Sequence, residues 1–264
     1  MTNLYLPLAV LLSAAPLAAL QPKPTLNCDS HHGDSRRANY CEMREQTVSA
    51  AGGVISIDGR PNGGIAVKGW DRTDILVRAQ VRTSAATDSD ARDLARQVNV
   101  QTTGAQIRAD GPAGNRDRSW SVSYEVFVPL RSSATLQSVN GGISISDVVG
   151  NLEFQAVNGG VTLKRVGGNV QGHTTNGGVR IELAGDRWEG TGLDVKTTNG
   201  GVTLAIPQSF SAQLEAETRN GGVHSDFPVV LPASTQRHLS TVLGSGGATL
   251  KVSTTNGGVT VKRL

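Results

Sequence analysis

Asn158-Gly159-Gly160-Val161-Thr162-Leu163-Lys164 is followed 18 residues later by Asn176-Gly177-Gly178-Val179-Arg180-Ile181-Glu182. Further copies of Asn-Gly-Gly begin at Asn140, Asn199, Asn220 and Asn256, and Ser245-Gly246-Gly247 is a degenerate copy. After each copy, apolar and polar residues alternate over a few positions, which is the pattern of a half-buried strand. The chain therefore contains an internal repeat, in which each unit packs mainly on its neighbours.

One repeat, such as residues 140–157, holds two strand-like runs and two turns. That content suffices for one turn of a flattened β-solenoid, which brings the chain back over its starting point about 4.8 Å further along. A β-meander with Asn-Gly hairpin turns is the alternative. The near-identical corners at 174–179, 197–202 and 254–259 favour the solenoid, because stacking requires equivalent residues at equivalent positions. We predict an all-β fold, namely a β-solenoid of the β-helix or β-roll type.

The corners predict a structural ladder along one edge. Asparagine tolerates and glycine prefers positive φ, which allows a tight corner, and an aligned asparagine column can hydrogen-bond from one repeat to the next. The predicted corner ladder consists of Asn140, Asn158, Asn176, Asn199, Asn220 and Asn256. A polar binding ridge is the functional alternative. On the outer surface, Lys164 and Glu182 are expected to pair one repeat apart.

One segment departs from the β pattern. Ala91, Leu94, Ala95 and Val98 recur at helical spacing after Thr87, a suitable N-cap. We expect one short amphipathic helix in the N-terminal half, covering a face or edge of the early strands. The expected organisation is a signal peptide over 1–20, a disulfide-pinned loop over 21–44, a β-strand region with the helix over 45–135, and the repeats over 136–264, continuous with that region and ending in an open last repeat at 254–264.

The first twenty residues are typical of a secretory signal peptide, with an apolar run and small residues but no charged side chain. Pro7 and Pro16 argue against a transmembrane span. Cys28 and Cys41 remain after cleavage, and in an oxidising compartment they predict a disulfide rather than a metal site. The net charge of +3 is spread too thinly for a nucleic-acid groove. We expect an extracytoplasmic protein without a transmembrane anchor once the signal is removed.

No nucleophile elbow, phosphate loop, zinc motif or dinucleotide fingerprint occurs. The sequence thus predicts no catalytic residue, no cofactor and no metal site. The longest repeat, 176–199, contains a polar bulge whose residues are candidates for contact with a sugar. These candidates are Glu182, Asp186, Arg187, Trp188, Glu189 and Asp194. The alternative is a polar loop anchored by one buried ring.

The run Cys41-Glu42-Met43-Arg44-Glu45, the stretch Asn62-Gly63-Gly64-Ile65-Ala66-Val67-Lys68-Gly69-Trp70-Asp71 and the Asn-Gly-Gly copies resemble the putative adhesin domain family of bacterial envelope proteins, a domain of unknown function. The resemblance covers roughly 41–264. It implies an exported bacterial β-strand-repeat protein with a solenoid-like fold, and it implies no catalytic residue.

The predicted export, together with a repeat that carries no catalytic motif, predicts a non-enzymatic, adhesin-like protein that is periplasmic or secreted. It would present a rigid polar surface to an envelope protein, a surface or a polysaccharide. Two alternatives remain open. One is a carbohydrate-active enzyme that uses the bulge at 182–194, and the other is a structural or regulatory component of the cell envelope.

Overall fold

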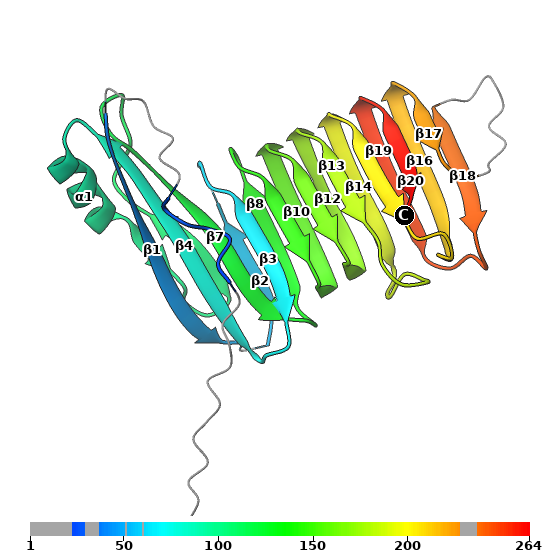
Figure 1. Ribbon diagram of the computed structural model, residues 1–264, viewed down its shortest axis with the longest axis horizontal. Helices are drawn as coiled ribbons and strands as arrows, with labels where there is room; N and C mark the ends of the chain where they lie inside the picture. Colours follow the sequence, from blue (N-terminus) through cyan, green and yellow to red (C-terminus); the bar gives the residue numbers. More distant parts are fainter. Residues whose placement is uncertain (1–22, 30–36, 51, 60, 228–236) are drawn as a thin grey trace, which may run out of the picture.

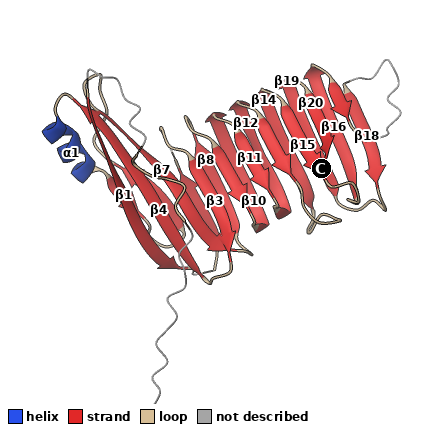
Figure 2. Ribbon diagram, viewed as in Figure 1, coloured by secondary structure: helices blue, strands red, loops and turns tan. Residues whose placement is uncertain are grey.

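The computed structural model describes residues 23–29, 37–50, 52–59, 61–227 and 237–264. The signal peptide expected over 1–20 lies outside these residues. Within these residues, the strands lie side by side along the long axis, with the helix α1 (Asp88–Gln97) at one end and β18 (His238–Leu243) at the other (Figure 1). Strands make up most of the described chain (Figure 2).

The described strands form two sheets of ten strands each. Sheet A contains, in spatial order, β1 (Ala38–Ser49), β4 (Asp74–Ala85), β7 (Ser119–Pro129), β3 (Ile65–Trp70), β9 (Ile143–Ser146), β11 (Val161–Lys164), β13 (Val179–Glu182), β15 (Val202–Ile206), β20 (Val259–Arg263) and β17 (Val223–Ser225). Sheet B contains β18 (His238–Leu243), β16 (Ala212–Asn220), β19 (Thr249–Asn256), β14 (Gly192–Asn199), β12 (Gly167–Asn176), β10 (Val149–Asn158), β8 (Ser133–Ser138), β2 (Val54–Asp58), β6 (Gln106–Asp110) and β5 (Asn99–Gln101).

Each repeat contributes one strand to sheet B and, after the Asn-Gly-Gly corner, one strand to sheet A. We call such a pair of strands a rung. Neighbouring rungs are parallel and in register, so that Val161 lies between Ile143 and Val179. A β-meander requires antiparallel neighbours and therefore does not describe the repeats. Antiparallel pairs occur outside the stacked rungs, at β1–β4, β4–β7, β5–β6 and β16–β18, so both sheets are mixed.

The order of rungs in space differs from their order in sequence. β20 pairs with β15 on one side and with β17 on the other, and β19 pairs with both β14 and β16. The expectation that 254–264 is an open last rung is therefore wrong. After β15 the chain passes over one rung position in the stack and forms the rung β16–β17 at the following position. It then returns, and β19–β20 fill the position that was passed over. The expected repeat region also begins too late, since Asn62 joins the stack through the rung β2–β3.

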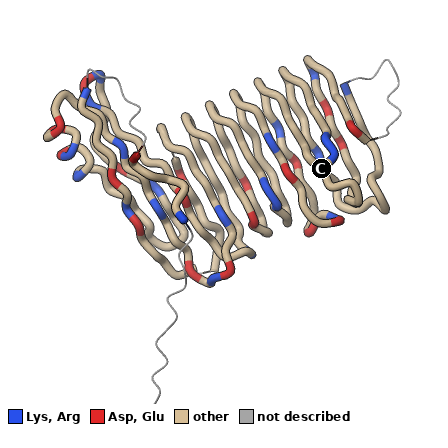
Figure 3. Tube along the Cα trace, in the orientation of Figure 1, with Lys and Arg blue, Asp and Glu red and all other residues tan. Residues whose placement is uncertain are grey.

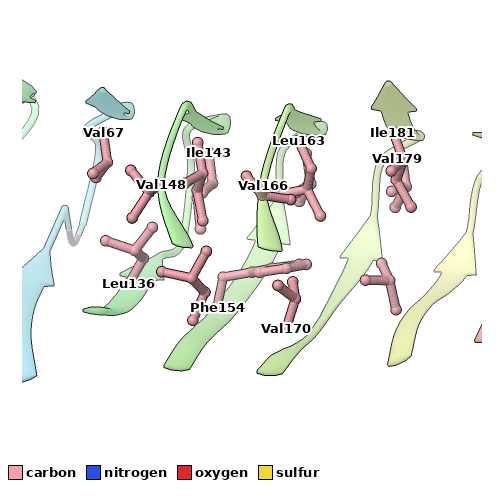
Figure 4. Close-up of a cluster of buried hydrophobic side chains, with 14 of the residues drawn as sticks. Val67, Leu136, Ile143, Val148, Phe154, Leu163, Val166, Val170, Val179 and Ile181 are labelled. Carbon is pink, nitrogen blue, oxygen red and sulfur yellow. The ribbon is translucent and has the colours of Figure 1, made fainter. Parts of the chain in front are cut away.

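Apolar side chains from both sheets form columns between them (Figure 4). The inward positions expected from the alternation are buried, among them Val161, Leu163, Val179 and Ile181. One column changes size abruptly, because Phe154 stands in register with Gly172. A β-carbon on Gly172 would lie 2.6 Å from carbons of the Phe154 ring. The missing side chain in one rung thus accommodates the large ring of the next.

A column of buried hydroxyl groups lies behind the corners. In four successive rungs, a threonine two residues before the asparagine donates its hydroxyl to the carbonyl of the first corner glycine in the preceding rung. These bonds join Thr174 to Gly159, Thr197 to Gly177, Thr254 to Gly200 and Thr218 to Gly257, at 2.7–2.8 Å. The inward threonine therefore satisfies a carbonyl of the neighbouring rung.

Replacing Thr197 with valine tests this column. The substitution keeps the shape of the side chain but leaves the Gly177 carbonyl without its hydroxyl donor. We expect the free energy of unfolding to fall by about 1–2 kcal/mol. Thr198→Val, at the exposed neighbouring position, is the matched control and should change stability by less than about 0.5 kcal/mol. Urea unfolding followed by circular dichroism measures both, and equal effects would contradict the assigned bond.

The corner glycines serve a different purpose from the one expected. Among the glycines that follow the six ladder asparagines, only Gly257 has a φ in the positive region. A β-carbon on Gly177 would instead lie 2.2 Å from the carbonyl oxygen of Gly159. The first glycine of each corner is therefore required because the backbones of neighbouring rungs approach closely, rather than because of a left-handed conformation.

At the N-terminal end, the structure confirms the expected helix and shows a shorter loop than expected. Helix α1 (Asp88–Gln97) begins after Thr87, whose side chain accepts a hydrogen bond from the Asp90 amide at 3.1 Å. It packs against β1 and β4 and buries Ala91, Leu94 and Ala95. The loop expected over 21–44 is too long, since β1 begins at Ala38.

Candidate functional site

The polar bulge at 182–194 is anchored by its tryptophan. The Trp188 ring is only 7% exposed, and its Nε1 donates to the Gly168 carbonyl at 3.0 Å. Asp186, Arg187 and Glu189 lie beside it and help to line a hollow of about 410 Å³. The ring therefore offers little surface to a ligand, although the polar side chains around it are exposed.

The charged candidates do not converge on one reactive centre. Glu182 lies on the outer face of sheet A and pairs with Lys164 at 3.5 Å, as expected. Asp194 lies on the outer face of sheet B and pairs with Lys196 at 3.3 Å. Glu189 pairs with Arg131 at 2.6 Å. A hydrogen bond from Arg187 holds the pKa of Asp186 below its usual value.

The ladder asparagines form one continuous chain of side-chain hydrogen bonds. Each Nδ2 donates to the Oδ1 of the neighbouring asparagine at 2.8–2.9 Å, in the spatial order Asn62, Asn140, Asn158, Asn176, Asn199, Asn256 and Asn220. Along this row each amide already bonds its neighbours. The ladder therefore joins the rungs, and its amides have less capacity left for a ligand.

The outer face of sheet B carries two rows of polar side chains in register. One row consists of Thr135, Glu153, Gln171, Asp194, Lys251 and Glu215, and the other of Gln137, Gln155, His173, Lys196, Ser253 and Glu217. We call these two rows the polar face. Positive and negative side chains are interspersed along the molecule rather than gathered in one patch (Figure 3). The polar face can therefore offer many hydrogen-bond donors and acceptors at a regular spacing of about 4.8 Å.

A hollow of about 250 Å³ lies in the polar face. Gln155, His173, Asp194 and Lys196 are among the residues that line it. Asp194 Oδ1 is shielded from solvent and has no hydrogen-bond partner within the described part of the chain. A buried acceptor without a partner is costly. The exposed side chains of Gln155, His173 and Lys196 can offer hydrogen bonds to a ligand in the hollow. The sequence did not indicate the hollow, because its members come from four separate rungs.

A second polar cluster lies at the N-terminal end of sheet A. We call residues 23–29 the strap, because they cross the outer face of this sheet and are linked to β1 by the Cys28–Cys41 disulfide. The expected disulfide is thus present. Closing a loop of this length stabilises a fold by roughly 3 kcal/mol on the chain-entropy model.

Beneath the strap, Glu125 is fully buried. It accepts hydrogen bonds from Thr25 and from Lys68 Nζ, the latter at 2.7 Å, and Arg78 NH1 lies 3.6 Å away. Burial raises the pKa of Glu125, but the bonds from Lys68 and Thr25 outweigh that effect and hold the pKa below its usual value. Glu125 therefore stays ionised and attaches the strap to the sheet.

This cluster predicts a dependence of stability on pH. Because the folded pKa of Glu125 is lowered, its contribution is present above the unfolded value near 4.3 and is lost as the pH falls through the folded value. We expect Glu125→Gln to lower the free energy of unfolding by about 2 kcal/mol at pH 7 and by progressively less as the pH falls below about 4.3. Denaturant titrations over a series of falling pH values test this, with Glu153→Gln on the exposed polar face as control. A difference from wild type that does not change with pH would contradict it.

Within the described ranges, no group of three or more His, Cys, Asp or Glu side chains is placed to hold a metal ion. No helix in that part of the chain is both long and apolar enough to cross a membrane.

Comparison with known proteins places these features in a family. A family model described as Toastrack DUF4097 matches residues 24–262, in agreement with the resemblance noted from the sequence. No curated protein matches the chain. Similar solved structures include a "putative cell adhesion protein" of Clostridium sporogenes, 11% identical, with a TM-score of 0.48 and coverage of 85% of this chain and 100% of that one.

Two further structures are similar at 84% coverage of this chain. A "putative lipid binding protein" of Parabacteroides distasonis is 9% identical, with a TM-score of 0.39 and 96% of its own chain covered. A "putative adhesin" of Bacteroides fragilis is 10% identical, with a TM-score of 0.34 and 97% covered.

Proposed function

This chain belongs to the Toastrack DUF4097 family, and from that premise we propose a non-enzymatic, exported protein whose stacked rungs form a β-solenoid and present the polar face to an envelope polysaccharide. The rungs act as a rigid scaffold, because backbone and asparagine contacts join neighbouring rungs, and threonine contacts strengthen four of these junctions. The polar face supplies the contacts with the partner.

The polar face with its hollow is the observation that carries this proposal. Amide, carboxylate, imidazole and ammonium groups stand in register across six strands, and polymers of hydroxylated sugars offer matching donors and acceptors at many points. Asp194 is among the residues that line the hollow, and its Oδ1 has no hydrogen-bond partner within the described residues. The proposal that the protein is not an enzyme is supported by Glu182 and Asp194, which lie on the outer faces of different sheets and pair with Lys164 and Lys196.

Retention of the purified protein on envelope polysaccharides tests the proposal. The wild-type chain is expected to bind at least one isolated cell-wall or surface glycan. The triple variant Gln155→Ala, His173→Ala, Lys196→Ala should bind it at least about tenfold more weakly, which corresponds to about 1.4 kcal/mol. The matched control is Thr162→Ala, Thr203→Ala, Thr260→Ala on the outer face of sheet A, which should bind as the wild type does. Failure of the wild type to bind any glycan fraction would remove the proposal.

Export is the second part of the proposal, and the Cys28–Cys41 disulfide supports it, since such bonds persist in oxidising compartments. Expression with residues 1–20 in a bacterial host should place the chain outside the cytoplasm. Sequencing of its N-terminus should give a mature chain that begins near Leu20 or Gln21. A full-length chain recovered from the cytoplasm would contradict export.

A further inference from the structure

The rung that comes last in the sequence lies between two earlier rungs in the structure. We call β19–β20 (Thr249–Arg263) the terminal rung, and the slot is the level that it fills between the rungs β14–β15 and β16–β17. In Figure 1 the red strands β19 and β20 lie between the strands that precede and follow them in the stack, and the C-terminus is inside the array rather than at its tip. Because the chain leaves this position free for the terminal rung, residues 207–211 must connect two rungs that are two strand spacings apart. That distance is about 10 Å, instead of about 5 Å between adjacent rungs.

The two sides of the slot bind the terminal rung through the contacts that join every other pair of rungs. Asn256 donates to Asn199 and accepts from Asn220, both at 2.8 Å. Thr254 Oγ1 donates to the Gly200 carbonyl, and the Gly257 carbonyl accepts from Thr218, both at 2.7 Å. None of these contacts depends on the covalent connection between the terminal rung and the slot.

The apolar contacts are equally independent of connectivity. Leu250 and Val252 are buried in register with residues of both flanking strands, and so are Val259 and Val261. The slot therefore recognises the side chains of the terminal rung, and the same rung from another molecule would make the same contacts.

The connection to the slot is a glycine-rich turn. Residues 244–248 lead from β18 to β19, and Gly244, Gly246 and Gly247 have positive φ. The turn is held by a bond from the Gly246 amide to the Leu243 carbonyl at 2.9 Å, and by bonds from the Ser245 amide and hydroxyl to the Ser211 hydroxyl at 3.2 and 3.3 Å. Extended, five residues span roughly 17 Å.

From the inserted rung and its glycine turn we infer that two copies of this chain exchange their terminal rungs, each filling the slot of the other. The exchanged dimer keeps every contact of the slot and loses only those of the turn. Closure within one chain has an effective concentration in the millimolar range, so exchange competes only when molecules fold at comparable concentrations.

A pair of cysteines across the slot distinguishes exchange from ordinary association. Lys196 and Ser253 are register partners on β14 and β19, at the spacing of neighbouring strands, which a disulfide can bridge. The full-length variant Lys196→Cys, Ser253→Cys is unfolded, refolded at about 1 µM and at about 1 mM, and oxidised. We expect a covalent dimer on a non-reducing gel after refolding at the high concentration, with at least a tenfold smaller fraction at the low one.

The control pair is Gln155→Cys, His173→Cys, which bridges β10 and β12 inside the body of the stack. Those two strands stay in one molecule in either form, so this variant should give only monomer on the same gel. Native mass spectrometry before the gel reports whether a dimer exists. Monomer at both concentrations would overturn the inference, and so would a dimer that separates into monomers on the non-reducing gel. If the Lys196 variant does not refold, Asp194→Cys with Lys251→Cys, the register pair two residues earlier, gives the same readout.

Discussion

Gly177→Ala is expected to abolish stable folding or to lower the free energy of unfolding by about 4 kcal/mol or more. The new β-carbon would lie 2.2 Å from the Gly159 carbonyl oxygen and 2.6 Å from its carbon. Overpacking costs about 1–3 kcal/mol when side chains can move, but here the obstacle is the backbone of the neighbouring rung. Relief requires separating the two rungs, which also weakens the bonds from Thr174 to Gly159 and from Asn176 to Asn158.

Gly178→Ala is the matched control one residue further on. The nearest atom to a β-carbon there is the Gly201 carbonyl oxygen at 3.4 Å, an ordinary contact. We expect a change in stability within about 0.5 kcal/mol. Urea unfolding midpoints for the two variants decide the matter. If Gly177→Ala were as stable as Gly178→Ala, the rungs could not approach as closely as described.

Gly172→Val should lower the free energy of unfolding by about 3 kcal/mol, the upper end of the cost of overpacking. Its β-carbon would lie 2.6 Å from carbons of the Phe154 ring, which is itself almost fully buried. The ring has to leave its position above Gly172 in the column. Thermal and urea unfolding of the purified variant measure the loss.

A double-mutant cycle then assigns the loss to this pair. Phe154→Val alone should cost about 3 kcal/mol through the cavity that it leaves. The double variant places valine at both positions, matching the Val195 that follows in the column, and it should recover at least about 2 kcal/mol relative to the sum of the single losses. Additive losses would contradict a direct contact between the ring and residue 172.

The structure of a single rung can be predicted well from the sequence, because the pattern that specifies it is local and recurs in each repeat. Alternation at 161–164 and 179–182 identifies the inward residues, and an 18-residue spacing brings Lys164 next to Glu182. The helix is equally local, since Thr87 and four apolar residues at helical spacing define it. The family resemblance follows from the same motifs, and the match to residues 24–262 confirms it.

The order of the rungs could not be predicted, because their corners are interchangeable. Residues 197–201 and 254–258 are both Thr-Thr-Asn-Gly-Gly, so either rung fits beside any other. The order depends on the link at 207–211 and on β18, whose sequences carry no repeat signal. The buried threonine column was overlooked even though a signal exists: a threonine recurs two residues before Asn176, Asn199, Asn220 and Asn256.

The candidate site could be predicted only in part, because contacts between distant segments form it. Local sequence marks Trp188 as an aromatic in a polar bulge, but its burial depends on the Gly168 carbonyl of the neighbouring rung. Glu125 alternates onto the outer face of its sheet and would be expected in water. It is buried because the strap, about a hundred residues earlier in the chain, crosses over it.

Distances between spin labels along the polar face test the stacking and its order most directly. Labels at Gln137 and Ser253 are separated by four strand spacings, or about 19 Å, and labels at Gln137 and Glu217 by five, or about 24 Å. Pulsed electron paramagnetic resonance on the two doubly labelled chains should therefore give the shorter distance for the pair with Ser253, which is later in the sequence. A shorter distance for the pair with Glu217 would contradict the inserted terminal rung, and distances far from both values would contradict the stacked rungs themselves.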